Sequence, residues 1–255
     1  MISAGSVVQG AALSHSPFVH LWLVDTGSRD CDQLLDRYSD TLHADEWLRL
    51  NRLKLARHKR SYTLTRILCR MVLSGYYPDI SPKHWFFSRS EFGKPSIGNS
   101  IGGPLYFNLS HSGDRIALGI TNIGELGVDI EQIHRSRDYC AIVDNHFSER
   151  EQFWVYATDE PERRRRFFKL WSLKEAYTKA LGEGLRIPLN GFSISPLPEP
   201  RIEKTWDQDR CSGVENWSFV SYSMENYELA LSLPVDIPAS LCRVMAFSSA
   251  SIQMA

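Results

Sequence analysis

The stretch GVDIEQI, residues 127–133, alternates apolar and acidic side chains over its central positions. Successive side chains of a β-strand point to opposite faces, so this alternation predicts a strand. We expect Val128 and Ile130 to face a core, and Asp129 and Glu131 to project together from the other face. Two like charges at this spacing repel each other, so the pair requires water, a basic partner or a cation.

Strands and helices are predicted in a mixed order on both sides of this stretch. Strands are predicted at 18–25, 84–90, 105–109, 115–121, 126–132, 192–195, 217–224 and 227–234. Helices are predicted at 30–40, 147–157 and 163–182, with two more within 43–77. We expect the strands between 105 and 132 to form a meander, and the polar, proline-rich residues 196–213 to form a loop.

The mixed order favours an α+β fold with mostly antiparallel pairing, because strict βαβ alternation is absent. The 255 residues suffice for one large domain or two small ones. A change of composition near residue 123 predicts two subdomains, residues 1–123 and 124–255.

Composition excludes several classes of protein. Hydrophobic residues make up 43%, charged residues 23%, and the net charge is −1, so nothing global indicates nucleic acid or a membrane surface as a partner. Five separated cysteines without a CxxC pair argue against a disulfide framework and a structural zinc site. No signal peptide and no apolar run of about 18 residues is found. We therefore expect a soluble, cytoplasmic protein.

The segment FFKLWSLKEAYTKALGEGL, residues 167–185, carries the second polar pattern. On a helix, Trp171, Glu175 and Lys179 fall on one stripe beside a large apolar surface. One interpretation is an exposed Glu–Lys pair worth a few tenths of a kcal/mol. The flanking aromatic residues favour the other interpretation, in which Glu175 and Lys179 belong to a binding site. Together with Asp129 and Glu131, these residues suit Mg²⁺ and phosphate, although an acidic pair alone is also common on solvated strands.

Three further stretches are ordinary features when each is taken alone. His111 follows a predicted strand, with Ser110 and Ser112 beside it, and is either structural or a donor to phosphate. Gly93, Lys94 and Pro95 form a stiffened turn. A basic run between residues 49 and 70 is either a solvated helix face or an anion site. The arginines 163–166 either begin a solvated helix or form a patch for an acidic protein.

In their order and spacing, FGKP, FNLSHS, GVDIEQI, FSEREQF and FFKLWSLKEAYTKALGEGL resemble the motifs of the 4′-phosphopantetheinyl transferase superfamily, in its long, single-chain Sfp-type form. The resemblance covers about residues 45–195. It implies a fold of two similar α+β subdomains related by a pseudo-twofold, with the site between them. It also implies a monomer.

The resemblance implies an enzyme with holo-carrier-protein synthase activity. The phosphopantetheine arm of coenzyme A moves to a serine of an acyl, peptidyl or polyketide carrier protein, with Mg²⁺ as cofactor and adenosine 3′,5′-bisphosphate as leaving group. The metal-site positions of the family match Asp129, Glu131 and Glu175, and its pyrophosphate lysine matches Lys179. The remaining coenzyme A contacts that it implies are Lys94, Ser110, His111 and, near the site, Lys174.

Two roles stay open at this point. The acceptor serine must lose a proton, and Glu175 is our candidate base, with Glu151 as its rival. The 3′-phosphate of coenzyme A needs a basic pocket, for which we expect Arg49, Arg52 and Arg60. A second surface for the carrier protein is expected on helix 147–157 and the arginines 163–166.

Other functions fit the sequence less well. A nucleotide hydrolase predicts a phosphate loop, but neither GxxxxGK[ST] nor GxGxxG occurs. A nucleic-acid-binding module predicts a basic domain, whereas the net charge is near zero. The remaining alternative is a non-catalytic homologue that binds carrier protein or coenzyme A without transfer.

Overall fold

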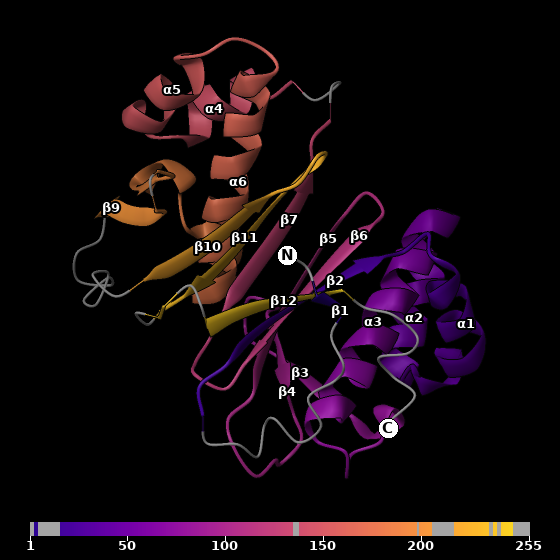
Figure 1. Cartoon of the computed structure of the whole chain (residues 1–255). Helices are drawn as coiled ribbons and strands as arrows, with labels where there is room; N and C mark the ends of the chain where they lie inside the picture. Colours follow the sequence, from indigo (N-terminus) through magenta and orange to yellow (C-terminus); the bar gives the residue numbers. More distant parts are fainter. Residues whose placement is uncertain are drawn as a thin grey trace.

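The protein is built from four layers, in which two β-sheets lie between two long helices (Figure 1). A computed structural model describes residues 3–4, 16–134, 138–197, 199–205, 217–234, 237–238 and 241–246. The outer helices are α3 (Ala56–Tyr76) and α6 (Glu162–Leu181). Apolar residues fill each of the three interfaces between neighbouring layers.

The first sheet has the strand order β1-β12-β2-β6-β5. Its strands are β1 (Ser3–Ala4), β2 (Val19–Asp25), β5 (Tyr106–Ser112), β6 (Arg115–Thr121) and β12 (Cys242–Ala246). Helix α3 packs on this sheet through residues such as Leu73 and Tyr76, which contact a cluster containing Trp22 and Phe107. The other elements of this half are α1 (Arg29–Tyr38), α2 (Ala44–Arg52), β3 (Phe87–Arg89), β4 (Pro95–Ile97) and the 3₁₀ turns Ser39–Thr41 and Pro82–His84.

The second sheet has the order β10-β11-β7, and α6 packs on its outer face. Its strands are β7 (Gly127–Gln132), β10 (Ser218–Ser223) and β11 (Tyr227–Leu233). Helices α4 (Cys140–His146) and α5 (Glu149–Tyr156) pack against α6 (Figure 1). The hairpin of β8 (Phe192–Ser195) and β9 (Arg201–Thr205) and the 3₁₀ turns Gly184–Arg186 and Leu189–Gly191 complete this half.

The same connectivity occurs twice. In the first half, β2 leads to α3 and then to the hairpin of β5 and β6, with β6 between β2 and β5. In the second half, β7 leads to α6 and then to the hairpin of β10 and β11, with β11 between β7 and β10. The α+β class is therefore confirmed, and so is the similarity of the two halves.

Two local predictions are wrong. The meander stops after β6, because both edges of β6 are already paired with β2 and β5, and β7 joins β11 in the second sheet. The predicted loop 196–213 contains β9, which pairs with β8; its residues 198 and 206–213 lie outside the described part. The division at residue 123 stays a prediction, and β12, from the end of the chain, belongs to the first sheet.

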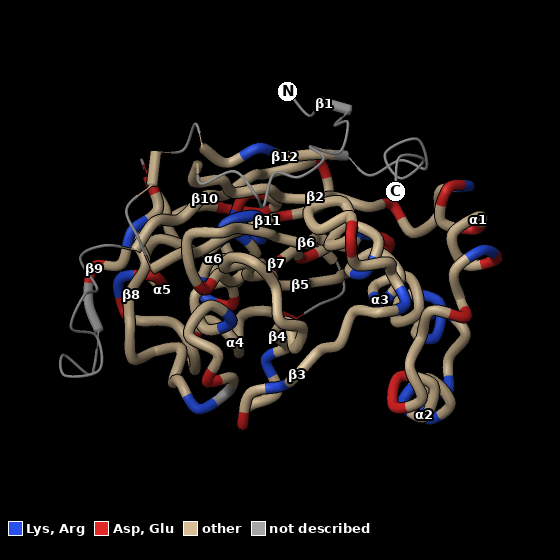
Figure 2. Tube along the Cα trace, turned by 90° about the horizontal axis from the view of Figure 1, so that it is seen from below, with Lys and Arg blue, Asp and Glu red and all other residues tan. Residues whose placement is uncertain are grey.

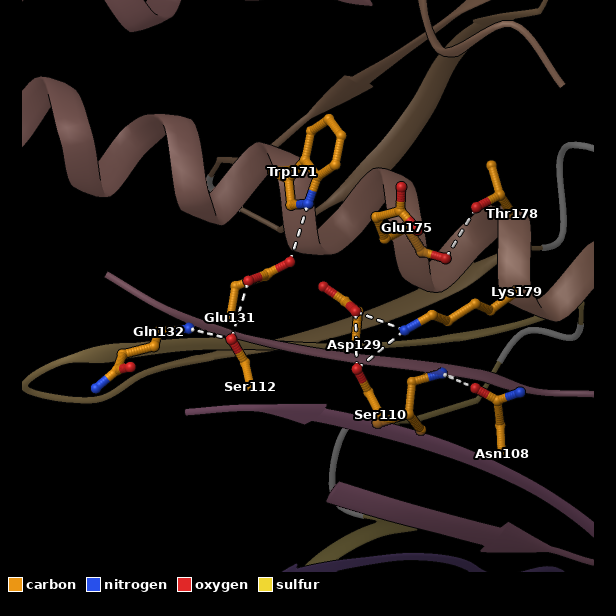
Figure 3. A network of polar contacts seen from close by, with 11 residues as sticks. Asn108, Ser110, Ser112, Asp129, Glu131, Gln132, Trp171, Glu175, Thr178 and Lys179 are labelled. Atoms are coloured by element: carbon orange, nitrogen blue, oxygen red, sulfur yellow. Dashed lines mark hydrogen bonds and ion pairs between the residues drawn. The ribbon is translucent and has the colours of Figure 1, made fainter. Parts of the chain in front are cut away.

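The strand predicted in GVDIEQI is confirmed. Val128 and Ile130 are buried in the apolar layer between the sheets, whereas Asp129 lies on the face toward α6 (Figure 3). Gly127 makes this contact possible, because a Cβ atom there would lie 1.8 Å from the carbonyl oxygen of Ala176 on α6. The absent side chain lets strand and helix approach backbone to backbone.

No helix in the described part of the chain has the length and apolar character needed to cross a membrane. Acidic and basic residues are interspersed along the described helices (Figure 2).

Candidate active site

Asp129, Ser110 and Lys179 form a three-membered polar network between β7, β5 and α6 (Figure 3). Oδ1 of Asp129 accepts from Ser110 Oγ at 2.9 Å and from Lys179 Nζ at 2.6 Å. Lys179 also donates to Ser110 Oγ at 2.9 Å. The basic partner that the acidic pair requires is therefore Lys179, from the predicted helical stripe.

Glu131 has a different set of partners two residues further along β7. Its Oε2 accepts from Ser112 Oγ at 3.1 Å, and its Oε1 accepts from the indole nitrogen of Trp171 at 3.2 Å. Ser112 Oγ in turn accepts from the backbone nitrogen of Gln132. The predicted stripe of Trp171, Glu175 and Lys179 therefore does face the acidic pair, as Figure 3 shows.

Side chains of β5 connect the edges of the two sheets. Asn108, Ser110 and Ser112 occupy alternate positions and therefore share one face of β5. The Asn108 side-chain oxygen accepts from the backbone nitrogen of Val128 at 2.9 Å, and the two serines donate to Asp129 and Glu131. The roles of Asn108 and Ser112 were not predicted from the sequence, although their alternation in FNLSHS was the available signal.

A pocket of about 330 Å³ opens beside this network. Glu175, Thr178 and Lys179 line one side of it, and the turn containing Phe92 and Lys94 lines another. The pocket thus lies between the two halves of the molecule and combines an acidic, a basic and an apolar wall. A phosphate ester with an organic tail has matching chemistry.

His111 lies on the opposite face of β5 from its neighbouring serines and is exposed. Loss of solvent around the ring, followed by the positive charges of Lys179 and then His58 of α3, lowers the pKa of His111. The contact of His111 with phosphate stays a prediction.

Glu151 and Lys174 are not part of this network, which corrects two expectations. Lys174 Nζ contacts Glu151 Oε1 at 2.7 Å and the carbonyl oxygen of Phe192 at 2.7 Å. The two side chains are 0% and 2% exposed. Oε1 of Glu151 also accepts from the backbone nitrogen of Ile194, and Oε2 accepts from that of Ser148.

This buried pair ties α6 to α5 and β8. Glu151 completes a capping box with Ser148 at the start of α5. A carboxylate with these partners cannot take a proton from an acceptor serine, and a lysine without exposure cannot contact coenzyme A. Burial lowers the pKa of Lys174 to about 8, against the opposing charge of Glu151.

The arginines expected at the 3′-phosphate differ in their surroundings. Arg60 donates to the carbonyl oxygen of Thr26 at 2.7 Å and pairs with Asp32 at 2.8 Å, so it ties α3 to the start of α1. Arg52 is exposed at the end of α2. Arg49 lies over the ring of Tyr62.

Arg49 belongs to a cluster of cations around Tyr62. Arg66 lies over the same ring, 5.2 Å from its centroid. Loss of solvent, then the positive charges of Arg66 and Arg49, lower the pKa of Arg89. Like charges held together in this way favour binding of an anion.

Lys94 contacts the end of α6. Its Nζ lies 2.6 Å from Glu125 and donates to the carbonyl oxygen of Ala180 at 2.8 Å. Gly93, just before it, has φ 87°, a left-handed conformation that favours glycine. The predicted turn is confirmed around Gly93, whereas Pro95 is already the first residue of β4. Lys94 joins the two halves beside the pocket.

The four arginines 163–166 all have partners within the protein, which argues against a patch free for an acidic protein. Arg163 donates to Thr158, and Arg164 to the carbonyl oxygen of His134. Arg165 donates to the carbonyl oxygens of Met224 and Glu225, and Arg166 to that of Trp154. Each guanidinium thereby fixes a neighbouring loop or helix end.

The carboxylates of the site fit a magnesium ion that is coordinated only in part by the protein. Among the described residues, no three His, Cys, Asp or Glu side chains are grouped to hold a metal by themselves. Mg²⁺ characteristically uses one or two carboxylates together with water and substrate phosphate. Oδ2 of Asp129 is buried without a hydrogen-bond partner in the described part of the chain, as a ligand oxygen would be.

The chain is similar to several known proteins. The sequence model of the 4′-phosphopantetheinyl transferase superfamily matches residues 125–232. The 4′-phosphopantetheinyl transferase HetI of Nostoc is 32% identical over 168 residues, which cover 66% of this chain and 70% of HetI. The 4′-phosphopantetheinyl transferase Sfp of Bacillus subtilis is 34% identical over 50% of this chain and 54% of Sfp.

Among solved structures, the similarity is partial. The holo-[acyl-carrier-protein] synthase of Helicobacter pylori, solved in complex with coenzyme A, is 21% identical with a TM-score of 0.35. The alignment covers 42% of this chain and 97% of that one.

Proposed function

The chain belongs to the 4′-phosphopantetheinyl transferase superfamily, and we propose that it is a holo-carrier-protein synthase. It transfers the 4′-phosphopantetheine group of coenzyme A to a serine of an acyl, peptidyl or polyketide carrier protein. The observation that supports this most directly is the Asp129–Lys179–Ser110 network beside a pocket that Glu175 also lines.

The reaction is a phosphoryl-type transfer in which positioning and charge neutralisation do most of the work. The serine oxygen forms a bond to the phosphorus that carries pantetheine, and the bond to adenosine 3′,5′-bisphosphate breaks. Lys179 is placed to offset negative charge that develops on the leaving group, because its side chain remains 29% exposed toward the pocket.

Glu175 is the proposed acceptor of the serine proton. It lies on α6 between Trp171 and Lys179 and lines the pocket, where an acceptor hydroxyl can approach it. Its rival Glu151 is enclosed by Lys174 and backbone donors. The proton stays on Glu175 as the neutral carboxylic acid until it passes on to water.

Magnesium is part of the proposal. Asp129, Glu131 and Glu175 would hold it, and it would neutralise charge on the pyrophosphate of coenzyme A. Of the three, Asp129 offers a buried oxygen without a partner among the described residues, and Glu131 is oriented by Ser112 and Trp171.

The 3′-phosphate of coenzyme A is proposed to bind the cluster of Arg49, Arg66 and Arg89. Three cations within electrostatic reach of one another around Tyr62 provide the charge that a dianion needs. Arg60 is left out because Asp32 and the Thr26 carbonyl satisfy it. Arg89 also donates to the carbonyl oxygen of Gly93 at 3.1 Å, which links the cluster to the turn of the pocket.

For the carrier protein we retain α5 and drop the arginines 163–166. Phe153 of α5 is 77% exposed, the highest value among the large apolar side chains of the described residues. Such a side chain suits a transient protein contact. A monomer, a cytoplasmic location and the absence of nucleic-acid and membrane partners remain our expectations.

The test is the intact mass of an apo carrier protein after incubation with this protein, coenzyme A and Mg²⁺. We expect a gain of one phosphopantetheine group that chelation of Mg²⁺ or the Glu175→Ala substitution abolishes. Asp36→Ala, at an exposed position of α1, is the matched control and should keep full activity. If coenzyme A binds but acyl, peptidyl and aryl carrier proteins all stay unmodified, the chain is a non-catalytic homologue.

A further inference from the structure

The two oxygens of the Asp129 carboxylate have unequal surroundings. Oδ1 accepts both the Ser110 hydroxyl and the Lys179 ammonium, at 2.9 and 2.6 Å. Oδ2 is buried and has no hydrogen-bond partner among the described residues, in a side chain that is only 5% exposed. A buried charged oxygen without a partner costs roughly 1–3 kcal/mol or more, and a bound ion is one recognised reason for it.

The Ser110 hydroxyl has no proton left for a ligand. Lys179 can only donate, so the Ser110 oxygen accepts from it and gives its single proton to Asp129. Ser110 is also only 8% exposed. A phosphate oxygen, which can only accept, therefore finds no donor at Ser110, although the family resemblance implies such a contact.

We infer that Ser110 is a positioning residue for the metal and does not contact phosphate. With Lys179 it occupies Oδ1 of Asp129 and so directs Oδ2 to the cation. Ser112 holds Glu131 in the same manner from the next position on that face of β5. This inference rests on the magnesium site of the proposed function. It assigns the serines of FNLSHS to the carboxylates.

The experiment measures binding of Mn²⁺ alone by electron paramagnetic resonance, with Mn²⁺ replacing Mg²⁺ as a visible ion that prefers the same oxygen ligands. Ser110→Ala should weaken Mn²⁺ binding about tenfold or more, as is typical when a partner of a metal ligand is removed. Ser110→Thr keeps the hydroxyl and should restore binding to near the wild-type value. At saturating Mg²⁺, the KM for coenzyme A should not change in Ser110→Ala.

Ser74→Ala is the control for loss of a buried serine. Its hydroxyl donates to the Ile80 carbonyl and accepts from Trp85, far along the chain from the site, so this variant should bind Mn²⁺ normally. Thermal unfolding of all variants separates misfolding from an altered site.

The opposite pattern would overturn the inference. If Ser110→Ala raises the KM for coenzyme A and leaves Mn²⁺ affinity unchanged, Ser110 is a phosphate contact. Absence of Mn²⁺ binding by the wild-type protein, with and without coenzyme A, would also overturn it. The two proposals can also fail separately. If the wild type binds Mn²⁺, Ser110→Ala weakens that binding, and no carrier protein is modified, the proposed function is contradicted and this inference is supported.

Discussion

Helix α6 contributes two lysines, five residues apart, that each pair with a carboxylate from another element. The surroundings of the two pairs differ. Lys174 and Glu151 are 0% and 2% exposed, and each also has a backbone partner. Lys179 and Asp129 are 29% and 5% exposed; Lys179 lines a pocket, and one oxygen of Asp129 has no partner among the described residues. The same two chemical groups thus hold the fold together in one place and remain available to a ligand in the other.

The comparison predicts that breaking the buried pair destabilises the fold. Glu151→Ala leaves the Lys174 ammonium buried without its counterion, so the free energy of unfolding should fall by about 3–5 kcal/mol. Urea denaturation measures this. The double variant Glu151→Leu/Lys174→Met should recover part of the loss, because no charge is then left unpaired. A loss below about 1 kcal/mol in the single variant would show that the pair is not structural.

Breaking the accessible pair should affect catalysis instead. Lys179→Ala should lower kcat/KM for phosphopantetheine transfer by about 10²–10³, because a cation aimed at developing charge is lost. The free energy of unfolding should change by no more than about 1 kcal/mol, as for partly exposed ion pairs. Rates from a carrier-protein mass assay and urea denaturation of the same samples provide both values. Equal loss of stability in Lys179→Ala and Glu151→Ala would remove the distinction.

The buried pair should also respond to pH. The pKa of Lys174 is lowered to about 8 in the folded protein from its ordinary value of 10.5. Between these values the unfolded chain binds more protons, so the contribution of Lys174 to stability increases as pH rises through this window. From pH 7 to pH 9.5 this amounts to about 2 kcal/mol. It should appear as a difference between the wild type and Glu151→Leu/Lys174→Met in urea denaturation, and parallel pH profiles would contradict it.

The smallest effect concerns the arginines at the start of α6. Arg165 donates to the carbonyl oxygens of Met224 and Glu225, so it belongs with the structural contacts of this helix. Arg165→Ala should cost about 1.5 kcal/mol of stability, the lower end of the range for hydrogen bonds to a charged group, and leave the KM for carrier protein unchanged. A rise in that KM without loss of stability would restore the arginines to the docking surface.

The periodic features of the sequence predicted much of this arrangement. The alternation of Val128, Asp129, Ile130 and Glu131 fixed the two faces of β7, and helical spacing brought Glu175 and Lys179 to one side of α6. Both patterns are local, so they can be recognised in the sequence without knowledge of the tertiary structure. The resemblance to the family then related the two segments to one reaction.

The errors concern contacts that local patterns do not encode. Nothing near β7 indicates that β6 has no free edge, because that depends on its pairing with β2 and β5. Glu151 and Lys174 are polar residues in motif positions, and only packing against β8 reveals that they face the interior. Ser112 and Asn108 acquire their roles because edge strands of two sheets lie side by side.

Gly127 offers a criterion for interpreting other sequences. The carboxylate of Asp129 on β7 meets Lys179 of α6 only because no side chain separates the two backbones at this point. A chain that carries D-x-E and K-E-x-x-x-K but a larger residue at the first position of the strand would hold the same chemical groups too far apart to cooperate. The glycine that contributes no functional group is therefore as diagnostic of an assembled site as the charged residues themselves.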